Sequence, residues 1–246
     1  MQEVRIYIPT KGRSKKQLTA ALLDKAGLNY YRVVEPTEAH LYDGDKIIRP
    51  LPEQSIAYVR NLILDDAIKS NVDWLIMIDD DIRSFGTTKN QRCVKTNASI
   101  INDFIKGLEK LPRNIIVATI RYRQNAWSET KDYNIDALCE VFVAINVKNL
   151  PTNIRYNADI FPDDRDFLLQ VLISGKHSIC FNRYWFACPK IGSNKGGFYD
   201  IYKSGKVLPM VEKLSQKWGD LVILQRRKDN TINVKINRKK IKELLK

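Results

Sequence analysis

The 246-residue sequence predicts an α/β fold in which parallel strands alternate with helices. Short apolar runs, typical of strands buried on both faces, alternate with longer amphipathic segments that are typical of helices. The clearest run is WLIMI at 74–78, which leads directly into three consecutive acidic residues. No apolar stretch approaches the roughly 18 residues needed to cross a bilayer, so no membrane association is expected.

The N-terminal part predicts three strands separated by two helices. The first helix is expected over 14–27, with Ser14 as its N-cap and Gly27 as its stop. The second helix is expected over 52–71, where apolar residues recur at helical spacing. Such alternation gives parallel strands joined by right-handed crossovers. The three strands are expected at 4–9, 30–36 and 74–78.

The remaining chain continues with strands and helices and ends in a basic segment. Helices are expected at 99–111, 162–176 and 238–246, and strands at 114–122, 140–147 and 177–190. A Gly-rich loop, GSNKGG, occupies 192–197, and 221–236 predicts a hairpin turning at 229–230. We therefore expect a core over 1–190 and a basic C-terminal hairpin and helix extension, 191–246, packed on the same domain.

The charge of the chain is concentrated near its C-terminus. The net charge is +13, and residues 190–246 hold 15 Lys and Arg against 5 acidic residues. This imbalance favours a polyanionic partner, most simply nucleic acid, although a solvated basic face is the alternative. The four cysteines are scattered without a metal-binding spacing, which predicts reduced core thiols in a cytoplasmic protein.

The acidic run at 79–81 lies where an open parallel sheet binds its ligands, beyond the carboxyl end of a strand. If the extended geometry persists, Asp79 and Asp81 point to one side and Asp80 to the other. Two carboxylates on one side suit Mg²⁺ or Mn²⁺, which also bind phosphate oxygens. An acidic loop or a helix cap is the alternative. We expect a divalent metal that carries a nucleotide diphosphate.

Four motifs in order, IPTKGR, AYVRN, WLIMIDDD and FPDDRDF, resemble the nucleotide-sugar glycosyltransferases of the GT-A fold over about 4–186. IPTKGRSK, RNLILDDA and GSNKGG are most similar to the TET-associated glycosyltransferases, a branch associated with the modification of phage DNA bases. The resemblance implies a GT-A-like Rossmannoid mixed sheet flanked by helices. It also implies a nucleoside diphosphate sugar as donor, with UDP as the expected nucleotide.

The resemblance also assigns roles to residues at the strand ends. Asp79 and Asp81 would bind the metal, and Asp79 would also meet the ribose. Arg60 would face the nucleotide or sugar, with a surface ion pair as the alternative. Glu35 would hold the base. The donor-binding set implied in this way is Thr10, Arg13, Glu35, Arg60, Asp79 and Asp80. Many GT-A enzymes add a late histidine to the metal shell, and neither His40 nor His177 suits that role.

The second acidic group, PDDRD at 162–166, would serve the acceptor. The family pattern makes Asp164 the catalytic base, which takes the proton from the attacking hydroxyl, with Asp163 beside it. In an enzyme that retains the anomeric configuration, both would only position the acceptor. A helix N-terminus satisfied by acidic residues is the structural alternative, and it accounts for Asp166.

Aromatic and basic residues that could contact DNA occur in the strands and in the tail. Such mixtures can stack a flipped base while basic groups bind phosphates, although strand aromatics such as Trp185 more often belong to the core. The expected DNA-binding residues are Arg121, Arg123, Trp127, Arg226, Arg227, Lys228, Arg238, Lys239 and Lys240.

Together these features predict a metal-dependent hexosyl- or pentosyltransferase. It would move a sugar to a hydroxylated pyrimidine, such as 5-hydroxymethylcytosine, flipped out of duplex phage DNA in the host cytoplasm. One alternative acceptor is a sugar already on DNA, or a protein or glycan. An alternative of another class is a nucleic-acid-binding protein whose catalytic site is dead.

Overall fold

A mixed sheet forms the centre of the protein in the computed structural model, which describes residues 2–52, 54–189, 207–226 and 232–245. Its strands are β1 Val4–Pro9, β2 Tyr31–Val34, β3 Lys46–Ile48, β4 Trp74–Ile78, β5 Ser84–Lys89, β6 Arg92–Thr96, β7 Ile115–Tyr122, β8 Tyr133–Ile135, β9 Phe142–Asn146 and β10 His177–Ala187. The order is β3-β2-β1-β4-β9-β7-β10-β5-β6, and β8 pairs with β10. The predicted mixed α/β fold is confirmed.

Strand direction changes in the middle of the sheet. β1 pairs in parallel with both β2 and β4, and β2 pairs in parallel with β3. β9 is antiparallel to both β4 and β7, whereas β7 and β10 are parallel. As a result, the carboxyl ends of β1, β4 and β7 and the beginning of β9 meet at one edge of the sheet. This edge holds the acidic residues that follow β4.

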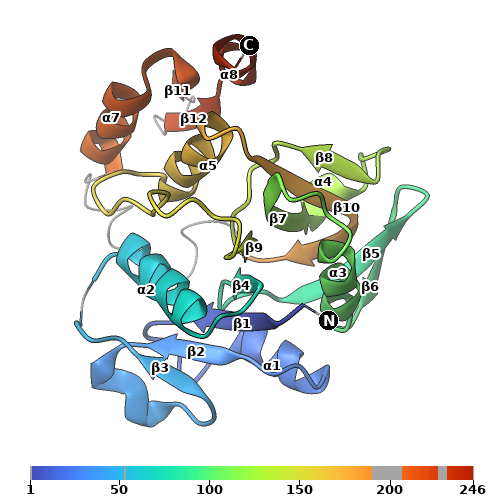
Figure 1. Cartoon of the computed structure of the whole chain (residues 1–246). Coiled ribbons are helices and arrows are strands. Elements are labelled where there is room, and N and C mark those ends of the chain that lie inside the picture. Colours follow the sequence, from blue (N-terminus) through green and yellow to red (C-terminus); the bar gives the residue numbers. More distant parts are fainter. Residues whose placement is uncertain (1, 53, 190–206, 227–231, 246) are drawn as a thin grey trace.

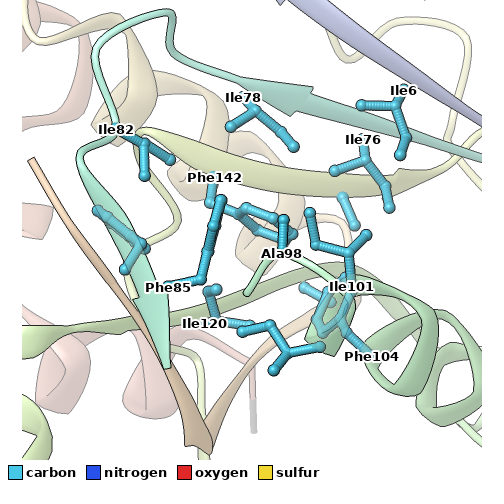
Figure 2. Packing of buried hydrophobic residues seen from close by; sticks show 14 of the residues in the cluster. Ile6, Ile76, Ile78, Ile82, Phe85, Ala98, Ile101, Phe104, Ile120 and Phe142 are labelled. Carbon is cyan, nitrogen blue, oxygen red and sulfur yellow. The ribbon is translucent and has the colours of Figure 1, made fainter. Parts of the chain in front are cut away.

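Helices cover both faces of the sheet (Figure 1). α1 Leu18–Lys25 and α3 Ile100–Leu108 pack on one face, with Ile76, Phe104 and Phe142 in their shared core (Figure 2). α2 Ile56–Lys69 and α5 Asp163–Ile173 pack on the other face, around Leu75 and Ile145. Burial of both faces explains why β4 is apolar along its whole length.

The C-terminal segment packs on the side of α5 that faces away from the sheet (Figure 1). It contains α7 Val207–Trp218, the 3-10 helix η2 Gly219–Leu221, the hairpin strands β11 Val222–Arg226 and β12 Ile232–Ile236, and α8 Arg238–Leu244. Asp166 of α5 is fully buried and accepts hydrogen bonds of 2.7 Å from both Lys217 Nζ and Trp218 Nε1. This carboxylate therefore anchors α7.

Some sequence expectations need correction. Ser14 does not cap α1, because the helix begins at Leu18 with Gln17 at its N-cap position and residues 14–15 form a turn. Gly27 has the positive φ of 65° expected at a helix stop. The cysteines are free thiols; Cys139 and Cys180 are buried as expected, whereas Cys93 and Cys188 are partly exposed, with Cys188 packed against the core. Within the described ranges, no helix combines the length and apolar character that spanning a bilayer requires.

Candidate active site

The acidic run at 79–81 does not continue the strand. β4 ends at Ile78, and Asp80 and Asp81 form a turn. The extended geometry on which the expected alternation depended therefore does not persist. Arg13 forms ion pairs with both Asp80 and Asp81, the second at 3.3 Å. The buried Asp80 also accepts a hydrogen bond of 2.7 Å from Thr10 Oγ1. Asp80 thus joins the end of β4 to the loop after β1.

Asp79 differs from its two neighbours, because its carboxylate forms no hydrogen bond or ion pair with another residue of the described ranges. Its backbone N–H donates to the carbonyl of Val141, 2.8 Å away, so the residue sits beside the start of β9. Burial raises the pKa of Asp79 to about 7, Asp81 and Asp80 add to the rise, and the nearby Arg60 guanidinium opposes it. Asp79 is therefore a candidate ligand for a cation.

The acidic edge fits a divalent ion held jointly with a substrate. No cluster of three or more His, Cys, Asp or Glu side chains suited to a metal exists within the described ranges. Asp79 and Asp81 nevertheless supply two carboxylates at one site, and Mg²⁺ commonly binds one or two carboxylates together with phosphate oxygens and water. His177 is engaged elsewhere, because its Nδ1 lies 2.9 Å from Asp136 Oδ1.

Arg60 and Asp163 form a buried ion pair between α2 and α5. Arg60 Nη1 lies 2.7 Å from Asp163 Oδ2, and the side chains are 13% and 8% exposed. Although burial alone would lower the pKa of Arg60, the charge of Asp163 outweighs it and the pKa is raised, with further contributions from Tyr156 and Asp79. Arg60 is therefore fully cationic. It lies between the acids that follow β4 and those that begin α5.

Asp164 belongs to a three-residue cluster with Glu140 and Arg165. Arg165 Nη1 lies 2.9 Å from Asp164 Oδ1 and 3.4 Å from Glu140 Oε2, and the two carboxyl groups also hydrogen-bond to each other. Burial, followed by the charge of Asp164, raises the pKa of Glu140 to about 8. Burial also acts against ionised Asp164, but Arg165 and the Glu140 hydrogen bond outweigh it and lower the pKa of that residue. Arg165 therefore favours the ionised form of Asp164, and a proton in this pair is favoured on Glu140.

Tyr122, the last residue of β7, lies between the two acidic groups. Burial raises the pKa of its phenol, and the charges of Glu140, Asp79 and Asp164 add to this rise. The hydroxyl is buried and has no hydrogen-bond partner within the described ranges. Tyr122 is therefore close enough to Asp79, Glu140 and Asp164 to feel the charges of both acidic groups.

Glu35, the residue expected to hold the nucleobase of the donor, directly follows β2. Its side chain is 2% exposed and pairs with the buried Arg49, whose Nη1 is 2.5 Å away. Arg49 Nη2 also donates to the carbonyl of Thr10 at 2.9 Å. Glu35 therefore helps to fix the loop after β1 through Arg49, and Lys11 lies 3.6 Å from the same carboxylate.

The residues predicted to bind DNA are spread over two regions. In the first, Arg121 forms an ion pair with Glu129, the guanidinium of Arg123 lies 5.5 Å from the centre of the Trp185 ring, and Trp127 is 59% exposed. Trp185 itself is buried and belongs to the core. The exposed Trp127 lies just after α4 Arg123–Ala126.

The second region is the tail. Arg226 ends β11, and Arg238, Lys239 and Lys240 form the exposed first turn of α8. Arg238 donates hydrogen bonds of 3.1 and 2.7 Å to the carbonyl of Asp136, which ties α8 to the core. Arg227, Lys228 and the GSNKGG loop lie outside the described residues.

The comparison with protein families decides the assignment. A family described as "TET-Associated Glycosyltransferase" matches residues 4–197, which include the strand ends, both acidic groups and Arg60. The chain belongs to this family. It is therefore a glycosyltransferase. No curated protein matches the sequence. Among solved structures, A197 from STIV matches with a TM-score of 0.47 and 12% sequence identity, over 75% of this chain and 84% of that one.

The site of this TET-associated glycosyltransferase includes two residues that the sequence did not single out, Glu140 and Arg49. Glu140 is an isolated acid in LCEVF, and only the antiparallel placement of β9 brings it to Asp164. Arg49 follows β3, a strand of three residues too short for its periodicity to be recognised. No local pattern marks either one, because each depends on strand pairing between distant segments.

Proposed function

We propose that this TET-associated glycosyltransferase moves a sugar from a UDP-sugar to the hydroxyl of a modified pyrimidine in DNA, such as 5-hydroxymethylcytosine. The observation that carries the proposal is the position of Asp164, which Arg165 Nη1 holds at 2.9 Å beside Glu140, near the acidic residues that follow β4. A base candidate near a metal-binding candidate is what transfer from a nucleoside diphosphate sugar requires.

Donor binding is assigned to the loop after β1 and the turn after β4. Asp79 and Asp81 would hold Mg²⁺ or Mn²⁺, which supplies Lewis-acid stabilisation of the leaving diphosphate when bound. Arg13 and Arg60 add positive charge on either side of these acids. Asp80, fixed by Thr10 and Arg13, keeps the turn in place for the donor.

The chemical step is assigned to Asp164. The acceptor hydroxyl oxygen forms a bond to the anomeric carbon as the bond from that carbon to the diphosphate oxygen breaks. The hydroxyl proton passes to the Asp164 carboxylate, and the nucleoside diphosphate leaves. Arg165 and Glu140 hold this carboxylate in position, and Asp163 acts through Arg60 as a positioning residue.

Replacement of Asp164 by asparagine tests this assignment. Loss of a general base lowers transfer by about 10²- to 10⁴-fold. Asp65→Asn is the matched control, because Asp65 lies on α2 with a side chain that is 60% exposed and pairs only with Arg155 in the described structure. Sugar transfer to hydroxymethylated duplex DNA is measured alongside binding of UDP. Transfer by Asp164→Asn within twofold of the unmodified protein would refute the role of Asp164.

A further inference from the structure

A cavity of about 670 Å³ opens beside Glu140, one member of the acid pair. Its walls come from the C-terminal half of β7, from α4, from β8 and from the loop that leads to β9. Arg238 of α8 contributes to the lining, so the basic tail forms part of the wall. The volume falls within the roughly 300–1,000 Å³ that is usual for small-molecule sites.

The cavity reaches the acid pair through Glu140, which lies in its wall. Glu140 and Tyr122 both line it, and Glu140 hydrogen-bonds to Asp164. A ligand that fills the cavity therefore presents its inner end to the acid pair. The unpartnered hydroxyl of Tyr122 and the unpartnered Nε of Arg121, both buried, lie on the same wall. A polar ligand that supplies partners would satisfy groups that are costly to leave unpaired.

The outer part of the cavity has a different chemistry. Asn125 and Lys131 line it, both are exposed, and neither side chain forms a hydrogen bond or ion pair with another residue of the described ranges. Arg238 is held at the rim by its bonds to the Asp136 carbonyl. This chemistry suits a nucleotide. The Asn125 amide can hydrogen-bond to the edge of a base, and the two cations can bind phosphates.

We propose that this cavity receives one nucleotide everted from duplex DNA, with the hydroxyl of its modified base directed at the Glu140–Asp164 pair. Lys131 and Arg238 contact the phosphates that flank this nucleotide, and Asn125 contacts the base. This inference rests on the proposed function and identifies where the acceptor binds. It also gives a role to Arg238, the residue of the basic C-terminal helix that lines the cavity.

The test uses base eversion, which needs no donor sugar. A duplex carries one 5-hydroxymethylcytosine with 2-aminopurine as its neighbour, because 2-aminopurine fluorescence rises when the adjacent base leaves the stack. We expect the full-length protein to raise this fluorescence. The double variant Asn125→Ala, Lys131→Ala should lose most of the rise and about tenfold or more in kcat/KM for DNA, with UDP-sugar hydrolysis unchanged.

Matched controls and opposing outcomes separate this inference from the proposed function. Asn102→Ala, Lys110→Ala removes one exposed amide and one exposed cation at α3 and should change neither readout. Normal eversion and normal kcat/KM in the cavity variant would overturn the cavity assignment while leaving the DNA transferase intact. Absence of eversion by the unmodified protein on every hydroxymethylated duplex would also overturn it. Donor hydrolysis without transfer to any DNA would instead refute the proposed function.

Discussion

Replacement of Glu140 by glutamine should change how the stability of the protein depends on pH. In the folded protein, burial and the neighbouring Asp164 raise the pKa of Glu140 from 4.5 to about 8. The folded state therefore keeps a proton that the unfolded state releases, so stability is lost as pH rises from about 5 to 8. Glutamine has no such proton and can still donate a hydrogen bond to Asp164.

The size of the effect follows from the same pKa. A rise from 4.5 to about 8, at about 1.36 kcal/mol per pKa unit, sets a ceiling near 5 kcal/mol. Because the Glu140 side chain is 24% exposed, water screens part of this cost, and we expect about 2 kcal/mol. The pKa of Asp164 is lowered, so its ionisation lies below the range from pH 5 to pH 8. It therefore does not alter the comparison between the unmodified protein and Glu140→Gln.

Urea unfolding at pH 5, 6, 7 and 8, followed by far-ultraviolet circular dichroism, measures the effect. Relative to the unmodified protein, Glu140→Gln should gain about 2 kcal/mol in its free energy of unfolding between pH 5 and pH 8. Glu212→Gln, an exposed position on α7, is the control and should show no such gain. Parallel curves for the unmodified protein and Glu140→Gln would refute the protonated state assigned to Glu140.

Three further perturbations test other parts of the structure. Asp166→Ala should lower the free energy of unfolding by about 3 kcal/mol, because Lys217, Trp218 and Gln170 all lose their buried acceptor. Asp166→Asn should lower it less, and urea unfolding distinguishes the two variants. Arg60→Met should lower the free energy of unfolding by about 3–5 kcal/mol at pH 7, because it leaves the buried carboxylate of Asp163 unpaired. A smaller loss at pH 4 than at pH 7 would identify this carboxylate as the cause. Joint replacement of Arg238, Lys239 and Lys240 by alanine should make DNA affinity less dependent on salt. The log–log slope should fall by about 0.9 for each phosphate that the variant no longer neutralises. An unchanged slope would remove α8 from the DNA-binding surface.

The elements that the sequence predicted correctly are those with strong local signals. The run 74–78 is β4, and the helical periodicity of 56–69 is α2 with Ser55 as its cap. The hairpin β5–β6 was missed because its strands are polar and partly exposed and its turn is Asn90–Gln91, both with positive φ, without the glycine that usually marks such turns. α7 was missed because Pro209 stands in its first turn, where proline is tolerated.

Part of the candidate site was also visible in the sequence, because its acidic residues stand beside elements with strong local signals. Asp79, Asp81 and Asp164 follow a strand or begin a helix, and these positions are visible in the sequence. The partner of each acid is not visible. Arg13 bridges Asp80 and Asp81 only because the chain turns after Asp79, and Glu140 reaches Asp164 only because β9 runs antiparallel to β4. Pairing between distant segments therefore determines which charged side chains meet at the site.

The most direct measurement of the central claim is the intact mass of a synthetic duplex that contains one 5-hydroxymethylcytosine. The duplex is incubated with the protein, Mn²⁺ and a panel of UDP-sugars, with matched reactions that contain EDTA or the Asp81→Asn variant. We predict that one UDP-sugar raises the mass of the hydroxymethylated strand by a single sugar residue, and that EDTA and Asp81→Asn each abolish the gain. An unchanged mass with every UDP-sugar, or a full gain in EDTA, would contradict the account.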